Sequence, residues 1–366
     1  MRTSAERNNH QRGDPFIDFD RAKRTARGAL HYSVVLPGGA MGLLTRDFDD
    51  ATELAYERVS VFTGLSVATG APPVRVMGRA AWVEANIDSL ANLMGQIELP
   101  TALAGSANAF TRTSSGVELG LMFSWLSQRV LGQYDMLGEG QQAIYYLAPN
   151  IYGIERRNGF PSEEFRRWIA LHEVTHHLQF AGVPWMRDHF LDLVGRAARL
   201  GSFDQKAMTV ALSRAREALA RGENPLAEGG VAAMLAGPEL LTVMREAQAM
   251  MSLMEGHAEY VMSRVAPDLV PSADRFARVL DDRRRHASPV ARLLQQALGF
   301  EAKLRQYREG HAFLDAVVAE CGEPMLARLW ERPENLPTSE EISTPARWTA
   351  RMTGAAHGGS SARALS

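Results

Sequence analysis

The stretch Leu171-His172-Glu173-Val174-Thr175-His176-His177-Leu178 contains the pattern His-Glu-x-x-His. Residues four apart on an α-helix lie one turn apart on the same face, so His172 and His176 can direct two imidazole nitrogens at one point. Glu173 projects beside them, where it could take a proton from a water bound to a metal. The spacing therefore predicts the first half of a zinc site together with its general base.

The residues around this pattern predict the helix that it needs. Pro161 fits the first turn of a helix, and Glu163 and Glu164 suit the positive end of the helix dipole. Gly182 favours the end of the helix. The pattern is therefore expected in the middle of a helix that begins near Pro161-Ser162.

A third ligand is expected on a second helix. The stretch from Pro238 to Val265 has no internal proline and predicts one long, methionine-rich helix. On it, Glu255 and Glu259 share a face, and a catalytic zinc site takes three protein ligands. Glu255 is the predicted ligand, and Glu259 would accept the remaining N–H of a ligand histidine. Two alternatives stay open, with Glu259 or His257 as the ligand instead.

Residues 141–149 differ in character from the helical stretches. They are β-branched and aromatic, with glycines before them and Pro149-Asn150 at their end, which predicts a strand at about residues 142–149. This strand is either an edge strand that pairs with a peptide substrate or an ordinary core strand. Apolar residues recur at helical spacing elsewhere, as in 79–97 and 117–135. The predicted fold is therefore mainly α (α+β), a helical protein with a small β-sheet next to the motif helix.

Composition excludes several classes of protein. The chain has 366 residues, a formal net charge of −2 and one cysteine, Cys321. Such a charge gives no global field for nucleic acid or anionic membrane, and one cysteine excludes an internal disulfide and a thiolate metal cage. Cys321 is expected to be a small buried residue near a helix end. No uncharged apolar run approaches the ~20 residues of a membrane span, so we expect a cytoplasmic protein.

The ends of the chain differ from its middle. Residues 1–14 are polar and predict a disordered leader, and residues 354–366 are small and polar and predict a flexible tail. Between them, we expect a single domain over residues 15–353. Its helical part would cover about residues 15–135 and its catalytic part about residues 136–353.

These motifs together carry a family resemblance. His-Glu-x-x-His followed at a distance by Glu-x-x-Ala-Asp is the pattern of the gluzincin metallopeptidases, and this chain has Glu255-x-x-Ala258-Glu259, with Glu in place of the final Asp. More closely, the chain resembles a bacterial family of uncharacterised zincin-like metallopeptidases, sometimes labelled as associated with deazaflavin-coenzyme biosynthesis. The matching stretches are 120–135, 146–150, 172–176 with 179–180 and 183–189, 255–262 and 303–307. The resemblance implies a zincin-type hydrolase that uses one zinc ion.

The functional hypothesis is hydrolysis of a peptide bond in a peptide or protein, with zinc held by His172, His176 and Glu255 and with Glu173 as the base. The oxyanion needs a second donor, for which the candidates are Tyr260, His257, Arg305, Tyr307 and His311. His177 is expected to face away from the metal, and His189 and Asp188 are expected to be structural, although Asp188 or Asp192 could support a ligand. The competing hypotheses are a zinc-containing binding or scaffold protein without turnover, and an amidohydrolase acting on a small metabolite.

Overall fold

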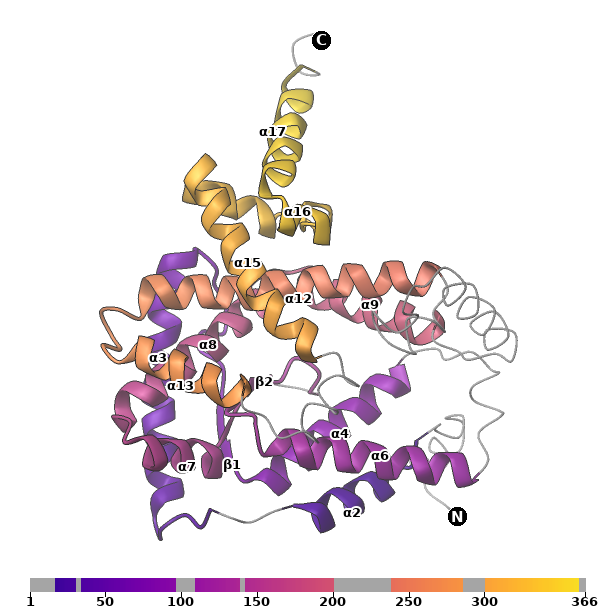
Figure 1. Cartoon of the computed structure of the whole chain (residues 1–366), viewed down its shortest axis with the longest axis vertical. Helices are drawn as coiled ribbons and strands as arrows, with labels where there is room; N and C mark the ends of the chain where they lie inside the picture. The colour runs from indigo at the N-terminus through magenta and orange to yellow at the C-terminus, as the bar shows by residue number, and fades with distance from the viewer. Residues whose placement is uncertain are drawn as a thin grey trace. The chain divides into compact units, whose positions relative to one another are not determined.

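The computed structural model describes residues 17–30, 34–96, 109–138, 142–200, 238–285 and 300–361. These residues form many helices and one small sheet (Figure 1), which confirms the predicted mainly α fold. In chain order, the elements are α2 (Phe19–Ala29), α3 (Ala40–Thr63), β1 (Val74–Met77), α4 (Arg79–Gln96), α6 (Ala109–Ser127), β2 (Gly132–Tyr134), β3 (Ile144–Leu147), α7 (Ala148–Asn158), α8 (Ser162–Ala181), α9 (Met186–Leu200), α12 (Pro238–Val265), α13 (Ala273–Arg285), α15 (Phe300–Cys321), the 3-10 helices η1 (Glu323–Trp330) and η2 (Pro333–Asn335), α16 (Ser339–Ser343) and α17 (Pro345–Ser361).

The chain divides into two compact units. The first comprises Met1–His177 with Asp268–Phe276, and the second comprises Leu178–Pro267 with Ala277–Ser366. The division falls inside α8, so one continuous helix contributes residues to both units. The expected single domain over residues 15–353 stays a prediction. The expected leader at 1–14 lies outside the described residues, whereas α17 continues through residue 354 to Ser361.

The sheet of the first unit has the strand order β1-β3-β2. β1 runs parallel to β3, from Val74 opposite Ile144 to Met77 opposite Leu147, and β2 runs antiparallel to β3 on its other side. All four residues of β3 are buried. The core-strand reading of residues 142–149 is therefore confirmed. The edge-strand reading is wrong, because both edges of β3 are already paired.

β2 was not predicted. The apolar stretch at 117–135 was expected to be one helix, but α6 ends at Ser127 and the chain becomes extended at Gly132. The backbone N–H of Leu147 donates to the carbonyl of Leu131, and the N–H of Asp135 donates to the carbonyl of Ala143. These bonds at both ends of β2 hold it in register along β3.

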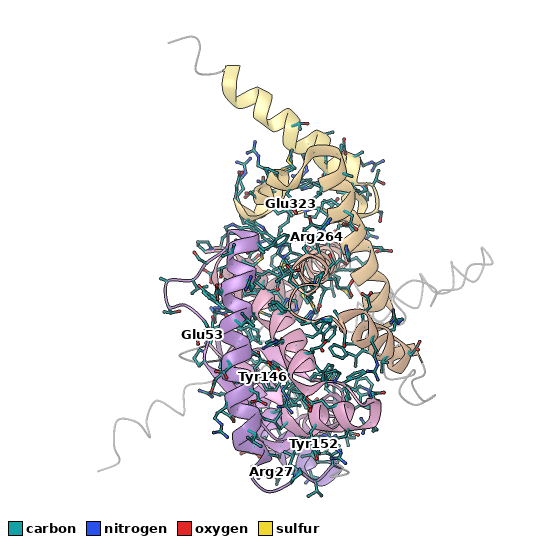
Figure 2. All side chains as sticks on the ribbon, turned by 90° about the vertical axis from the view of Figure 1, so that its left-hand side faces the viewer. Arg27, Glu53, Tyr146, Tyr152, Arg264 and Glu323 are labelled. Atoms are coloured by element: carbon teal, nitrogen blue, oxygen red, sulfur yellow. The ribbon has the colours of Figure 1, made fainter. Side chains whose placement is uncertain are left out.

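The two faces of β3 pack against different helices, because successive strand residues point to opposite sides. Tyr146 stacks on Phe48 of α3 with ring centroids 3.8 Å apart, and its hydroxyl is 2.8 Å from that of Thr52. Figure 2 shows Tyr146 beside the helix that carries Glu53. Tyr145 and Leu147 instead join a core cluster with residues of α2 and α4, namely Ala22, Ala26, Trp82, Val83 and Ile87.

In the second unit, α15 crosses α12 at two glycines, Gly256 and Gly310 (Figure 1). A methyl group on Gly310 would overlap the carbonyl oxygen of Ser252 and lie 2.9 Å from its carbonyl carbon. A methyl group on Gly256 would lie 2.5 Å from the Cα of Gly310. The two backbones are therefore in direct contact, one residue away from Glu255.

We predict that Gly310→Ala destabilises the protein by about 1–3 kcal/mol, because the added methyl group must push two packed backbones apart. Gly354→Ala in α17 is the matched control, since nothing lies within 4 Å of its added methyl group. That control should be neutral or stabilising by about 0.5–1 kcal/mol, the gain from replacing a helical glycine. Urea unfolding measures both, and equal free energies of unfolding for the two variants would contradict the crossing.

Candidate metal centre

The helix α8 places the His-Glu-x-x-His pattern as expected. It begins at Ser162, directly after Pro161, with Glu163 and Glu164 in its first turn. It ends at Ala181, and the N–H of Gly182 donates to the carbonyl of Leu178 at 2.9 Å. The pattern therefore lies mid-helix, where residues four apart share a face.

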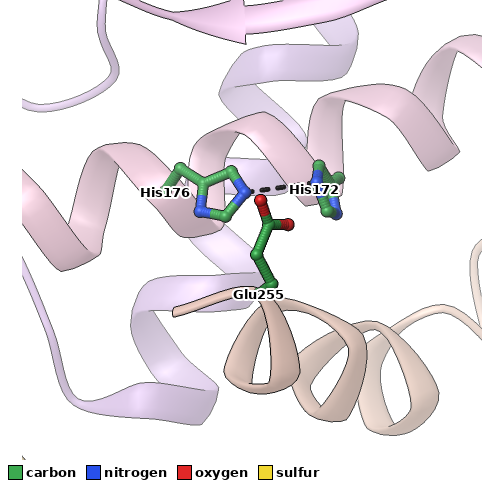
Figure 3. A group of neighbouring side chains, drawn as sticks. All are labelled: His172, His176 and Glu255. Carbon is green, nitrogen blue, oxygen red and sulfur yellow. Dashed lines mark hydrogen bonds between the residues drawn. The ribbon is translucent and has the colours of Figure 1, made fainter. Parts of the chain in front are cut away.

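The two histidines of the pattern converge. From Ile169 to Phe180, every residue of α8 is buried except His172 and His176, which are half-buried. Their Nε2 atoms are 3.2 Å apart and their rings are nearly perpendicular, at 86°. Two imidazole nitrogens bound at ~2.0–2.1 Å to one tetrahedral zinc ion would be about 3.3 Å apart. The separation therefore suits a shared metal ion, and it also permits the hydrogen bond drawn in Figure 3.

Glu255 completes a donor set for a metal. One ligand atom from each of His172, His176 and Glu255 lies within 4.8 Å of the others, and Figure 3 shows the carboxylate directed at the two imidazoles. Glu255 is buried in α12, where residues 252–258 are all buried. A buried carboxylate needs a proton or a cation beside it. Two imidazole nitrogens and one carboxylate oxygen are the donors of many catalytic zinc sites, so these residues fit zinc.

Gln179 connects α8 to α12 within the second unit. Its buried amide donates to the carbonyl of Met254 at 2.8 Å and lies 3.0 Å from Nδ1 of His257. Gln179 follows His176 by about one turn of the same helix, and Met254 precedes Glu255 directly. This bond therefore ties the C-terminal end of α8 to the turn of α12 that precedes Glu255. Sequence reasoning missed it, because nothing in the sequence pairs these positions.

His257 has a packing role. It is buried, its Nδ1 is bonded to Gln179, and its ring meets Trp330 edge-on with centroids 4.8 Å apart. These contacts hold the ring on the Gln179 side of α12. They give His257 a structural explanation that needs no metal.

Glu173 is buried in the first unit, against β2. Its Oε2 accepts a hydrogen bond from the backbone N–H of Tyr134 at 3.2 Å, and its side chain lies against Gly132. The expected general base is thus oriented by the backbone of the strand that the sequence did not reveal. A glycine in a short polar stretch after an apolar helix was the signal available for it.

Glu259 and His311 form an ion pair between α12 and α15. Nδ1 of His311 is 3.9 Å from Oε2 of Glu259, and its Nε2 is 3.3 Å from Oδ2 of Asp315. The interaction with Glu259 raises the pKa of His311, burial opposes that shift, and Asp315 adds to it. The expected role of Glu259 beside a ligand histidine stays a prediction.

Tyr260 and the remaining oxyanion candidates have different surroundings. The buried hydroxyl of Tyr260 donates to Glu323 at 3.0 Å, and the Arg264 guanidinium lies 5.2 Å from its ring centroid. Figure 2 labels Arg264 and Glu323 in this region. Burial, and then Glu323, raise the pKa of Tyr260. The side chains of Arg305 and Tyr307 lie outside the described residues.

His177 packs between two tyrosines rather than toward the histidine pair. Its ring meets Tyr134 edge-on at 5.2 Å and Tyr56 at 6.2 Å, measured between centroids. Its nitrogens are buried without a hydrogen bond of ordinary geometry. Burial lowers the pKa of His177 to about 4, against an opposing effect of the Gly70 backbone. The imidazole is therefore neutral at pH 7.

The remaining residues named from the sequence are Asp188, Asp192, His189 and Cys321, and their surroundings are ordinary. Asp188 is exposed, 4.0 Å from Arg187, and Asp192 lies 3.8 Å from Arg196 on the same helix. His189 meets Trp185 edge-on at 5.9 Å. Cys321 ends α15 as predicted, but it is half-buried rather than buried, because the last turn of a helix is partly open to solvent.

Two comparisons found proteins similar to this chain. The sequence model of a family described as zincin-like metallopeptidase matches residues 17–349. A crystal structure from Chloroflexus aurantiacus, described as a "putative hydrolase with a novel fold", is similar with a TM-score of 0.69 and 28% identity, covering 92% of this chain and 99% of that one. No protein with a curated description matches the chain. Within the described ranges, no helix combines the length and apolar character needed to cross a membrane.

The pair of His311 with its two carboxylates predicts a pH-dependent stability. The pKa of His311 in the folded protein is raised above the unfolded value of 6.5. The contribution of protonated His311 to the free energy of unfolding is therefore fully present below pH 6.5, and it is lost as the pH rises through the folded-state pKa. His311→Gln should therefore cost at most about 1 kcal/mol at pH 6, since the partners are partly exposed, and less at pH 8.5.

Urea unfolding of the wild type and His311→Gln at both pH values measures this difference. His189→Gln is the control, because burial lowers the pKa of His189 and its effect on stability has the opposite trend with pH. A cost for His311→Gln that grows toward pH 8.5 would contradict the assignment.

Proposed function

Because the chain belongs to the zincin-like metallopeptidase family, we propose that it is a zinc-dependent peptidase. Family membership supports a metal-dependent hydrolase, and the peptide substrate is the further step of the proposal. The observation that carries it is the group formed by His172, His176 and Glu255, with ligand atoms within 4.8 Å of one another. Glu173 follows the first of these ligands directly.

Each residue of the group has a defined task. His172, His176 and Glu255 would hold one zinc ion through two nitrogens and one oxygen, which leaves a coordination position open. When bound there, zinc supplies Lewis-acid chemistry, which makes water more acidic and polarises a scissile carbonyl group. Glu173 takes the proton of the attacking water on its carboxylate and delivers it to the leaving amine. The N–H of Tyr134 holds one carboxylate oxygen during both transfers.

The outer edge of β2 supports a peptide as the substrate. Leu131 and Asp135 direct their ladder bonds at β3, so the N–H and C=O of Gly132 and the C=O of Tyr134 point away from it, beside the Tyr134 N–H that binds Glu173. Glu173 lies on this outward side. An extended peptide that pairs with such an edge would run past the base. The substrate-binding role that was considered for β3 therefore suits β2. We expect this activity in the cytoplasm, on peptides or proteins rather than nucleic acid or membrane.

We predict that Glu173→Gln keeps one zinc ion per chain and loses hydrolysis by about 10²–10⁴-fold, because the amide cannot accept the proton. Metal analysis of the purified variant and a peptide library digested by both proteins measure the two effects. Asp188→Asn, a substitution of an exposed carboxylate, should leave both unchanged. A zinc-loaded wild type that cleaves no peptide would contradict the peptidase and favour a metabolite amide or a scaffold role.

Zinc should also stabilise the fold, because it binds the native site and not the unfolded chain. At a free zinc concentration 100 times Kd, the gain is about 2.7 kcal/mol. We predict that chelated wild-type protein recovers this stability when zinc is added, and that Glu255→Gln recovers much less. Glu259→Gln is the comparison variant, because it tests whether Glu259 rather than Glu255 is the zinc ligand. If Glu259→Gln abolished the zinc response and Glu255→Gln did not, the ligand assignment would be reversed.

A further inference from the structure

Gly132 lies directly beside the side chain of Glu173, the proposed base. A methyl group on this residue would be 2.6 Å from both Cγ and Oε1 of Glu173, and 2.8 Å from Cδ. Real side-chain carbons do not approach one another this closely, so one partner would have to move. Glu173 therefore occupies the space that a side chain at position 132 would fill.

The backbone of Gly132 does not itself require glycine. Among the described residues, the glycines with positive φ are Gly39, Gly64, Gly70, Gly159 and Gly322. Gly132 is instead in an extended strand, where glycine is unfavourable because it gains no packing and loses more conformational freedom than other residues. What glycine provides at this position is room beside the carboxylate.

The strand is held too firmly to retreat from an added side chain. Gly132 is opposite Tyr146, whose ring is stacked on Phe48. Beyond the other end of β2, the buried carboxylate of Asp135 accepts hydrogen bonds from the Tyr145 hydroxyl at 2.6 Å and from the Gly138 N–H at 3.0 Å. Glu173, at the end of a flexible side chain, is the partner that would shift.

We propose that Gly132 is a positioning residue for the base, and this rests on the proposed function. Two features of the strand act on Glu173: the N–H of Tyr134 binds Oε2, and the missing side chain of Gly132 leaves room for Cγ and Oε1. Together they set where the carboxylate stands relative to the metal-binding residues of α8. Any side chain at position 132 displaces the base and leaves the three metal ligands in place.

Gly132→Ala should keep one zinc ion per chain, lower kcat by about 10²-fold and change KM little, because a displacement near 1 Å at a reacting group costs that much. Gly78→Ala is the matched control, since Gly78 follows β1 in the same sheet and nothing lies within 4 Å of its added methyl group. In a Glu173→Ala background, Gly132→Ala should cause no further loss of activity. An unchanged kcat for Gly132→Ala would overturn the proposal.

A second measurement does not depend on activity or metal. In protein freed of zinc by a chelator, Gly132→Ala should lower the urea midpoint of unfolding, and this loss should disappear in the Glu173→Ala background, where the methyl group has room. An equal loss in both backgrounds would overturn the contact. If the wild type neither binds zinc nor cleaves peptides, the proposed function fails. The midpoint comparison still decides whether Gly132 positions Glu173.

Discussion

The burial of α8 is the constraint on which the site depends. A polar group withdrawn from water must find a partner, and α8 carries buried polar side chains along its length. Three polar side chains of α8 find partners on three different elements: Arg166 on Glu155 of α7, Glu173 on the backbone of β2, and Gln179 on the backbone of α12. The same contacts hold residues 162–177 of α8 against α7 and β2 in the first unit, and residues 178–181 against α12 in the second. His172 and His176, half-buried between them, are the residues of the central turns that remain reachable.

Glycines allow unusually close contacts at several places around the site. Gly132 lets Glu173, the proposed base, lie against a strand, while Gly256 and Gly310 let the helix that carries Glu255 touch its neighbour backbone to backbone. In each case the glycine is not needed for an unusual backbone angle, since none of the three has a positive φ. Close approach is therefore obtained by omitting a side chain. Backbones in contact, as at Gly256 and Gly310, have little freedom to shift, which suits the proposed metal ligand Glu255.

Local signals in the sequence were sufficient for the two helices that carry the metal-binding residues. α12 runs from Pro238 to Val265 as predicted, because proline starts it and no breaker interrupts it. The central position of β3 was not readable, since it depends on pairing with residues 74–77, far away in the chain. β2 was hidden because three residues are too short for a strand period and the apolar helix before it continues nearly to them. The contact of Gln179 with α12 is equally non-local.

The hydrogen bond to Glu173 comes from the main chain of Tyr134, and this bears on how the sequence can drift. A main-chain donor is supplied by any of nineteen residue types, and only proline lacks it. The identity of the side chain at position 134 is thus decoupled from the orientation of the base. Mutations there can alter packing around His177 or the edge of the sheet while the carboxylate keeps its donor. For this hydrogen bond, the pairing of β2 must be preserved rather than the side chain at position 134.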